Sequence, residues 1–208
     1  MKILALDSSS PIASVAVVSF GNGDATVDFE SNTPHARSDS SALFAALQQA
    51  VDSCGTPDAL CVGLGPGSYN GLRAGIAAAR AFATALNIPL HAVPSPLGLA
   101  GPGSGFWAAG DARGGHYWIA AIKEGRFLEK PTLLLPPEAS LHLRSRPSFP
   151  ILSATELPGC DDMTMATPDA TRLAMLAKTS DPFFLTSGTP EPLYLKPPHI
   201  TAPRPSAS

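Results

Sequence analysis

The sequence predicts an α/β protein in which one pattern of strands and helices occurs twice. Two observations lead to this prediction. The first hundred residues alternate between strand-like and helix-like hydrophobic periods, and the same order of element types returns after residue 101. With 208 residues and 44% hydrophobic side chains, the chain can form one large domain or two small domains that share an interface.

Three consecutive antiparallel strands are expected at the N-terminus. The short apolar run KILALDSS, residues 2–9, is typical of a buried strand that ends in polar residues. Residues 13–20 and 25–31 form two further β-like runs, and the second of them alternates with a period of two. An Asn-Gly pair at residues 22–23 lies between these runs, which indicates a β-hairpin.

A helical period then replaces the strand period. Leu43, Leu47 and Val51 recur at i, i+4 and i+8, as on the apolar face of an amphipathic helix. Asn87 and Pro89 are expected to end a second helix, which is rich in alanine. The patterns together predict a helix, a strand, a helix and a strand over residues 38–55, 59–65, 72–86 and 89–93.

A Gly- and Pro-rich stretch at residues 95–105 is expected to join two subdomains, 1–100 and 101–200. In the second, three strands, a short helix, a strand and a helix are predicted over residues 105–113, 116–125, 126–136, 138–143, 149–154 and 169–178. We expect no C-terminal helix that returns to the first subdomain. Residues 201–208, rich in Pro and Ser, are expected to be disordered.

Two βββαβαβ units in tandem are typical of the actin-like, ribonuclease-H-like duplicated fold, in which a cleft separates the halves. The first hairpin turn of each half then points into the cleft. Here both of these turns, residues 7–11 and 111–115, begin with aspartate, as in enzymes that hold a metal-bound nucleotide. The candidates for such a site, active or vestigial, are Asp7, Ser8, Ser9 and Asp111. Asp and Ser also cap tight turns by local hydrogen bonds, and the residue types alone favour that structural interpretation.

The glycine-rich segment GLGPGSYNGLRAG, residues 63–75, does not match a phosphate-binding loop. No lysine follows its glycines as in a Walker motif, and it is not a G-x-G-x-x-G sequence. We therefore interpret it as a strand-to-helix turn in which glycines supply positive φ angles and Pro66 fixes one dihedral. A helix N-terminus at this turn would attract an anion only weakly.

The helix predicted over residues 72–86 carries small side chains around most of its circumference. Leu72, Ile76, Ala79 and Ala83 form one stripe, and Gly75, Ala78, Phe82 and Ala85 form another. One explanation is the high helix propensity of alanine in a solvent-facing helix. The other is a helix that lies between its own sheet and a partner protein, with Arg73 and Arg80 forming ion pairs at the rim.

Several classes of function are not indicated. Net charge is −3, with 14 basic and 17 acidic residues, so the chain lacks the basic patch of an autonomous nucleic-acid binder. No H-x-x-x-H pair, C-x-x-C pair or G-x-S-x-G elbow occurs, so we predict no metal site, no cofactor and no hydrolase triad. Three cysteines without a disulfide pattern, and no signal-peptide or membrane-spanning run, predict a cytoplasmic protein.

Three segments resemble the bacterial TsaB (YeaZ) family. They are ILALDSSSPIASVAV, VGLGPGSYNGLRAGIAAARAFATALNIPLHAVPS and DARGGHYWIA, and they are similar to the family's D-T/S-S-T, G-x-GPGSFTGLRxG and DARRGEVY motifs. The match covers roughly residues 2 to 120, with the three segments in the family's order. The run PLYLK at residues 192–196 resembles the family's closing P-x-YLR.

This resemblance implies an actin-like fold in a protein without catalysis of its own. Family members pair with the catalytic subunit TsaD and the ATPase TsaE to make threonylcarbamoyladenosine at adenosine 37 of tRNA. The chain would bind tRNA only through that complex, would form a homodimer when isolated, and would not bind a membrane. It lacks the metal-binding H-x-x-x-H of the catalytic relative. Dimers of the family are built on the helices that correspond to residues 39–54 and 71–86, so the predicted partner-binding residues are Leu43, Leu47, Arg73, Gly75, Ala78, Ala79 and Phe82.

Overall fold

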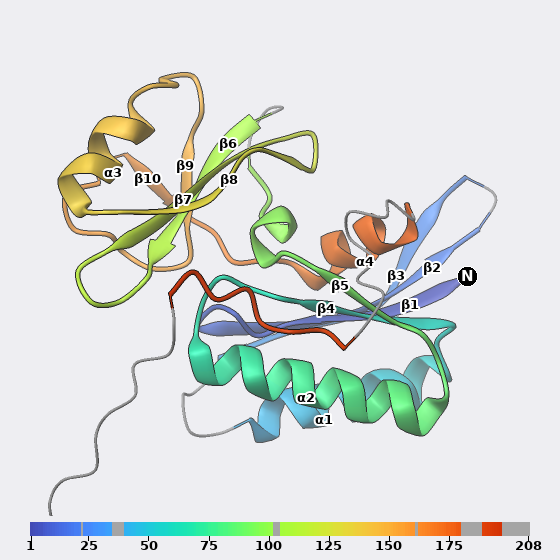
Figure 1. The fold of residues 1–208 in the computed structure, drawn as a ribbon. Coiled ribbons are helices and arrows are strands. Elements are labelled where there is room, and N and C mark those ends of the chain that lie inside the picture. Colours follow the sequence, from blue (N-terminus) through green and yellow to red (C-terminus); the bar gives the residue numbers. More distant parts are fainter. Residues whose placement is uncertain (22, 35–39, 102–104, 161, 180–188, 197–208) are drawn as a thin grey trace, which may run out of the picture.

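The computed structural model describes residues 1–21, 23–34, 40–101, 105–160, 162–179 and 189–196. Within these residues the chain forms two five-stranded sheets, one above the other in Figure 1, which are joined by a short 3-10 helix, η1 (Ser95–Gly98). The duplicated α/β fold expected from the sequence is confirmed. The predicted tail, residues 201–208, lies outside the described residues.

The first sheet contains every strand predicted in the first hundred residues. Its strands are β1 (Lys2–Asp7), β2 (Ile12–Phe20), β3 (Ala25–Pro34), β4 (Ala59–Gly63) and β5 (Leu90–Val93). Their order across the sheet is β3-β2-β1-β4-β5, with β1, β2 and β3 antiparallel and β1, β4 and β5 parallel. Helices α1 (Ser41–Cys54) and α2 (Tyr69–Leu86) cover one face of this sheet (Figure 1).

The second sheet repeats this plan in a shorter form. Its strands are β6 (Gly105–Asp111), β7 (Tyr117–Lys123), β8 (Arg126–Leu134), β9 (Ile151–Ser153) and β10 (Met163–Met165), in the order β10-β9-β6-β7-β8. Helix α3 (Pro136–Leu143) packs on its outer face. Strand β10 was not predicted, because a run of three residues is too short to show a hydrophobic period.

Helix α4 (Ala170–Lys178) corrects the expectation that no C-terminal helix returns to the first half. It lies on the face of the first sheet opposite α1 and α2, where Leu173 and Ala174 join the core formed around Ile3 and Ala5. The Ser14 hydroxyl of β2 accepts a hydrogen bond of 3.0 Å from the backbone N–H of Ala170, at the start of α4. The apolar stripe of α4 indicates that one face of this helix is buried, but not which sheet buries it. Periodicity alone therefore could not assign α4 to one of the two sheets.

The core that contains α4 also extends to the second sheet. Phe106, Ala108, Trp118 and Leu152 of that sheet belong to the same buried cluster as the residues of β1 and α4. The two sheets are therefore joined by a continuous apolar core, although a division into subdomains 1–100 and 101–200 remains our proposal. Among the described helices, none combines the length and apolar character that crossing a membrane requires.

Candidate functional site

The turn after β1 and the glycine-rich segment before α2 fit together residue by residue. A β-carbon on Gly63 would lie 1.8 Å from Oδ2 of Asp7, and one on Gly75 would lie 2.1 Å from Oγ of Ser8. A β-carbon on Gly67 would lie 2.2 Å from the backbone oxygen of Ser9. We call residues 7–9, Asp-Ser-Ser, the D-S-S turn. Each of the three glycines thus allows the close approach of one residue of this turn. This placement supports the interpretation of the segment as a strand-to-helix turn, but of its glycines only Gly65 has the expected positive φ angle.

The same contacts set the start of α2. The backbone N–H of Ser68 donates to the Ser9 carbonyl at 2.7 Å, and the Ser68 hydroxyl accepts from the Gly71 N–H at 3.3 Å as the N-cap. The Ser8 hydroxyl donates to the Gly71 carbonyl at 2.8 Å. Asn87 ends the helix with a left-handed backbone, as expected from the sequence.

Asp7 is completely buried beneath Gly63. Its Oδ1 accepts hydrogen bonds from the Ser9 N–H at 2.8 Å and from the Ser9 hydroxyl at 2.6 Å. Its Oδ2 is buried, with no well-oriented hydrogen-bond donor among the described residues. Burial raises the pKa of the Asp7 carboxyl above its ordinary value, and the hydroxyls of Ser9 and Ser95 oppose this rise without cancelling it.

This pKa shift predicts how stability depends on pH. Above the ordinary pKa the unfolded chain has lost the Asp7 proton while the folded chain still holds it, so the free energy of unfolding falls as pH rises toward the folded-state value. The Asp7→Asn variant keeps an Oδ1 acceptor and removes the titration. We expect it to gain stability relative to the parent as pH rises above the ordinary carboxyl pKa of about 4. Urea unfolding at several pH values measures this gain, and two parallel pH profiles would contradict it.

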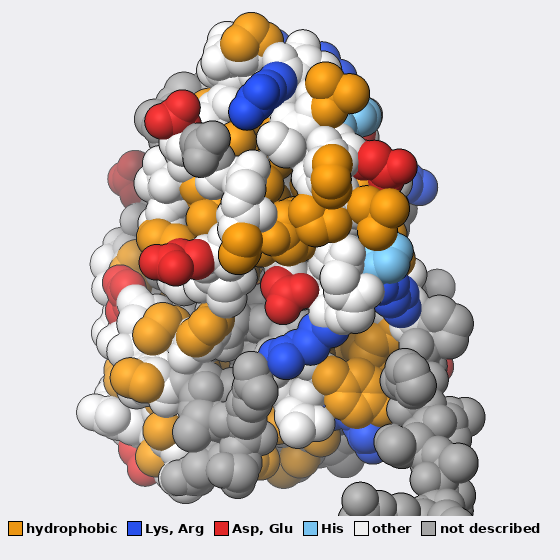
Figure 2. Space-filling view, turned by 90° about the vertical axis from the view of Figure 1, so that its left-hand side faces the viewer, with side chains coloured by type: hydrophobic (Ala, Val, Ile, Leu, Met, Phe, Trp, Pro, Cys, Tyr) orange, Lys and Arg blue, Asp and Glu red, His pale blue; other side chains and the backbone are white. Residues whose placement is uncertain are grey.

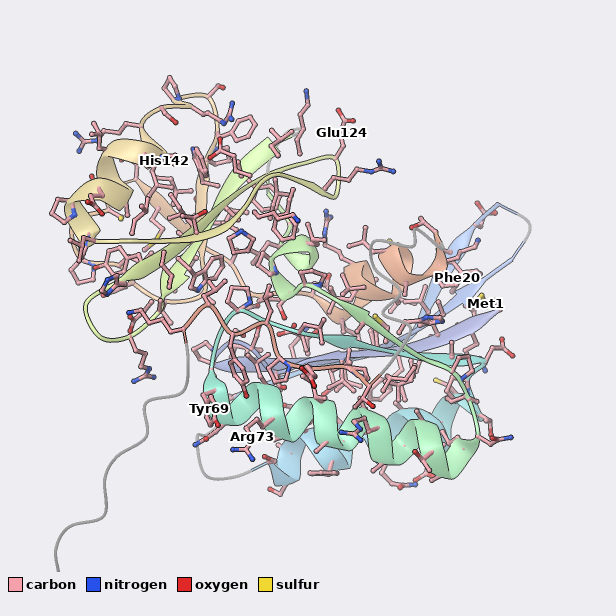
Figure 3. All side chains as sticks on the ribbon, in the orientation of Figure 1. Met1, Phe20, Tyr69, Arg73, Glu124 and His142 are labelled. Atoms are coloured by element: carbon pink, nitrogen blue, oxygen red, sulfur yellow. The ribbon has the colours of Figure 1, made fainter. Side chains whose placement is uncertain are left out.

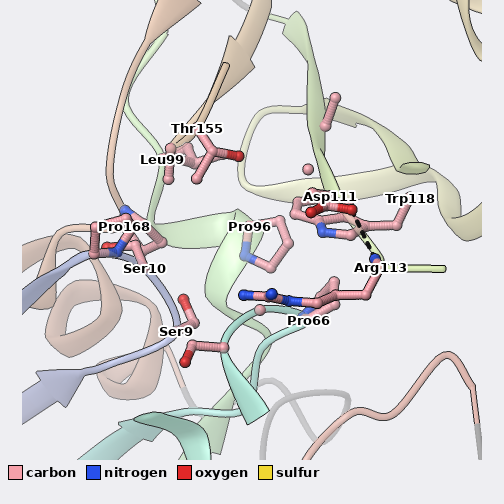
Figure 4. Close-up of a pocket in the computed structure, with 16 residues that line it drawn as sticks. Ser9, Ser10, Pro66, Pro96, Leu99, Asp111, Arg113, Trp118, Thr155 and Pro168 are labelled. Atoms are coloured by element: carbon pink, nitrogen blue, oxygen red, sulfur yellow. Dashed lines mark hydrogen bonds between the residues drawn. The ribbon is translucent and has the colours of Figure 1, made fainter. Parts of the chain in front are cut away.

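A cavity of about 300 Å³ lies between the two sheets. Its walls come from the D-S-S turn, the glycine-rich segment, η1 and the turn between β6 and β7 (Figure 4). Of the predicted nucleotide-site residues, Ser9 and Asp111 line this cavity, whereas Asp7 and Ser8 do not. The structure therefore brings two of the four predicted residues together at the cavity. The other two are packed away from it, Asp7 beneath Gly63 and Ser8 against α2.

These residues do not fit a metal-bound nucleotide. The Asp7 carboxylate is sealed under Gly63, and the Ser8 hydroxyl is engaged with the carbonyl of Gly71. Across the described part of the chain, no group of three His, Cys, Asp or Glu side chains is placed to hold a metal ion. The alternative of an actin-like ATPase or phosphotransferase that uses Asp7 and Asp111 is thus not favoured by this geometry.

The structure also corrects the choice of partner-binding residues. Leu43, Leu47, Gly75, Ala78 and Ala79 are buried against the chain's own sheet, where a partner cannot reach them. Phe82 is half-buried in the same core, and Arg73 is exposed. The two stripes that suggested a two-sided helix have centres about 110° apart on a helix of 3.6 residues per turn. Apart from the exposed Ala85, their residues form one wide inward face.

Apart from Arg73, the outward surface of these helices consists of residues that were not predicted to bind a partner. On α2 the exposed positions at helical spacing are Arg73, Ala77, Arg80, Ala81, Thr84 and Ala85. On α1 they include Phe44, Ala45 and Gln48, and Phe44 is 44% exposed. We call this set the outer helix face. Most of these residues were not predicted, because the sequence does not distinguish an alanine that faces the sheet from one that faces solvent.

The C-terminal segment Pro190–Lys196 was not predicted to contact α2, although its PLYLK run was noted. The Leu193 N–H donates to the Leu64 carbonyl at 2.8 Å, which ties this segment to the end of β4. The Tyr194 ring stacks on that of Tyr69, with centroids 5.3 Å apart. Arg73, one turn further along α2, donates to the Tyr69 hydroxyl at 3.1 Å (Figure 3). The segment thereby borders the N-terminal end of the outer helix face.

Hydrophobic side chains gather on a second surface, in the upper half of Figure 2, over the half of the molecule that holds the second sheet. The large exposed hydrophobic residues of that half are Leu128, Leu135, Leu141 and Met165, and Leu141 on α3 is 76% exposed. Helix α3 lies at the opposite end of the molecule from α2 (Figure 1). This surface is therefore separate from the outer helix face and supplies a control position for it.

The paired sheets, the first helix pair and the cavity between the sheets define a protein of the actin-like, ribonuclease-H-like duplicated α/β class. Within that class the chain is similar to YeaZ from Pseudomonas aeruginosa, with a TM-score of 0.74 and 22% identity over 93% of this chain and 99% of that one. A second structure, an uncharacterized P. aeruginosa protein with similarity to peptidase YEAZ, gives a TM-score of 0.67 at 22% identity over 94% and 99% of the two chains. The chain has the YeaZ fold, which confirms the resemblance to that family.

Sequence comparisons agree with this placement. Residues 30–113 match the family model of TsaD, tRNA N6-adenosine threonylcarbamoyltransferase. An uncharacterized protein of Mycobacterium tuberculosis is 38% identical over 97 residues, which is 45% of this chain and 45% of the relative. An uncharacterized protein of Mycobacterium leprae is 30% identical over 142 residues, 65% of this chain and 39% of the relative. The chain thus spans less than half the length of these curated relatives.

Proposed function

We propose that this chain is a non-catalytic subunit that binds a TsaD-like catalytic subunit in the complex that makes threonylcarbamoyladenosine at adenosine 37 of tRNA. The YeaZ fold and the TsaD family match over residues 30–113 support this proposal. The matched residues include both α1 and α2. We place the partner contact on the outer helix face.

The single observation that carries the proposal is the composition of the outer helix face. Ala77 and Ala81 are exposed one turn apart, and the exposed Arg73 and Arg80 lie beside them. Small side chains let another backbone approach closely, and the flanking guanidinium groups can pair with acidic groups at the rim of an interface. Exposed Phe44 on α1 adds an aromatic side chain of the kind that is enriched in interfaces.

A non-catalytic role agrees with the geometry between the sheets. Asp7 and Ser8, the two residues of the D-S-S turn that most resemble phosphate and metal ligands, are used to pack the turn, Asp7 beneath Gly63 at the end of β4 and Ser8 against α2. The subunit would need no cofactor of its own. With a net charge of −3 it would contact tRNA only through its partners, which we propose to be a TsaD-like subunit and a TsaE-like ATPase in the cytoplasm. In isolation, the outer helix face would pair with a second copy.

Co-purification with the cognate TsaD-like protein tests the interface. The double variant Ala77→Arg, Ala81→Arg places two bulky charges on the exposed side of α2 without entering the core. We expect it to lower the affinity for the partner by about a hundredfold, a magnitude typical of an interface hot spot. Titration calorimetry with the purified partner measures the loss.

A matched control is available on α3. Leu141→Arg also places a charge at an exposed apolar helix position, but on the opposite end of the molecule. This variant is expected to bind the partner as the parent does. Undiminished binding by the α2 double variant would refute the assignment of the interface. An equal loss of binding in both variants would also contradict it, because the effect would then not be specific to the outer helix face.

A further inference from the structure

Arg113, in the turn between β6 and β7, is held in an unusual backbone conformation. Its φ angle is 59°, a left-handed value that residues other than glycine rarely adopt. Its N–H donates to Oδ1 of Asp111 at 2.7 Å, and its carbonyl accepts from Nζ of Lys196 at 3.0 Å. The backbone of Arg113 is thus held on both sides of the α-carbon, which sets the direction of its Cα–Cβ bond.

The side chain of Arg113 extends into the cavity between the sheets. Figure 4 shows its guanidinium group between Pro66 and Pro96 and directed toward the D-S-S turn, where Ser9 lies. Across the described residues, this guanidinium group has no hydrogen bond, ion pair or ring contact. A cation with five donors is therefore presented to the cavity without a partner from the chain itself.

Asp111 presents the opposite charge to the same cavity. Its Oδ1 holds the Arg113 N–H, while its Oδ2 has no partner in the described part of the chain. The Asp111 carboxylate and the Arg113 guanidinium lie on one hairpin but form no ion pair with each other, and they point to different parts of the cavity (Figure 4). The cavity therefore displays a separated positive and negative charge.

The remaining walls are largely apolar. Leu99, Trp118 and several prolines line the cavity, together with the hydroxyls of Ser10 and Thr155. Its volume of about 300 Å³ is at the lower end of the range for small-ligand sites. An adjoining hollow of about 630 Å³, bordered by the Lys196 segment, shares Arg113 and Trp118 with it. A small ligand can thus enter from that side.

We propose that this cavity binds a small zwitterion, a free α-amino acid with an apolar side chain. The ligand carboxylate would pair with the Arg113 guanidinium, and its ammonium group with Oδ2 of Asp111. The apolar side chain would lie against Leu99 and Trp118. This site shares Asp111 with the predicted nucleotide site but differs from it in chemistry, because it needs no metal ion and uses the Arg113 guanidinium. It is independent of the partner interface on α1 and α2.

Three matched probes test the proposal on the full chain. L-Valine carries both charges, 3-methylbutanoate keeps only the carboxylate, and 2-methylpropan-1-amine keeps only the ammonium group. Binding at neutral pH is followed by chemical-shift titration. We expect L-valine to bind, and each single-charge probe to bind about tenfold more weakly or worse, because each loses one charge-assisted pair.

Two conservative variants connect these probes to the residues. Asp111→Asn keeps the Oδ1 acceptor for the Arg113 N–H, and Arg113→Gln removes the charge while it keeps a polar, although shorter, side chain. We expect Asp111→Asn to weaken binding of L-valine and the amine but not of 3-methylbutanoate, and Arg113→Gln to weaken L-valine and 3-methylbutanoate. Arg80→Gln, on the outer helix face, is the control and should bind every probe as the parent does.

Three results would overturn the proposal. They are no saturable shifts with L-valine, equal affinities for L-valine and 3-methylbutanoate that persist in Asp111→Asn, and unchanged binding of all probes in Arg113→Gln. The second result would identify a site for anions only. Circular dichroism of each variant establishes that the fold is retained, so that lost binding reports on the site.

Discussion

Gly67→Ala is expected to lower the free energy of unfolding by about 3 kcal/mol, at the upper end of the range for overpacking. The new β-carbon would lie 2.2 Å from the backbone oxygen of Ser9. That oxygen cannot move away easily, because it accepts the hydrogen bond from the Ser68 N–H that begins α2. Relief of the clash must separate the D-S-S turn from the helix, and so weaken the packing of α2 on the sheet. Chemical denaturation followed by circular dichroism measures the loss.

Gly21→Ala is the control for this prediction. A β-carbon on Gly21 has no heavy atom within 4 Å, and this residue does not have a positive φ angle. Alanine at such a position is expected to be neutral or to stabilise the fold by up to about 1 kcal/mol, because it restricts the unfolded chain. Equal effects of the two substitutions would mean that the contact between the glycine-rich segment and the D-S-S turn is unimportant for stability.

Leu173→Ala is expected to cost about 3 to 5 kcal/mol, the range for removing a leucine from a well-packed core. Leu173 is fully buried where α4 meets the first sheet, in the cluster that also contains Trp118 of the second sheet. Because this core is shared, the substitution should destabilise both sheets together. Both tryptophans of the chain, Trp107 and Trp118, lie in the second sheet, so their fluorescence reports on the sheet that α4 does not cover.

The decisive measurement is a comparison of two unfolding curves. Tryptophan fluorescence and far-ultraviolet circular dichroism should show one shared midpoint, displaced equally by Leu173→Ala. Met175→Ala, on the exposed side of the same helix, should change the free energy of unfolding by less than about 0.5 kcal/mol. A fluorescence midpoint that does not move while the circular dichroism midpoint does would show that the two sheets unfold independently.

The sequence predicted the elements of the first sheet well, because their signals are local. Leu43 and Leu47 revealed the period of α1, and Asn87 ended α2 with the left-handed backbone that asparagine tolerates. The interpretation of the glycine-rich segment as a backbone turn is likewise supported by the contacts of Gly63, Gly67 and Gly75. However, nothing in the sequence indicated that each of these three glycines would face a different residue of the D-S-S turn.

The candidate site was predicted less well. Ser9 and Asp111 were expected at the cleft and do line the cavity, but Asp7 is buried away from it and Arg113 was not considered. Residue type gives the chemistry that a side chain can perform, yet a buried carboxylate and a cavity-lining carboxylate look alike in one sequence. The direction in which the Arg113 side chain leaves the backbone depends on backbone hydrogen bonds to Asp111 and Lys196. Lys196 lies 83 residues away along the chain.

The sequence by itself determined the order of strands and helices in the first sheet, the turn chemistry and the resemblance to YeaZ, because each of these is encoded within a few neighbouring residues. Only the tertiary structure decided which face of α2 points outward, that α4 returns to the first sheet, and which charges meet in the cavity. The physical reason is that hydrophobic periodicity specifies that a face is buried but not what buries it. That choice depends on how distant segments pack into one shared core.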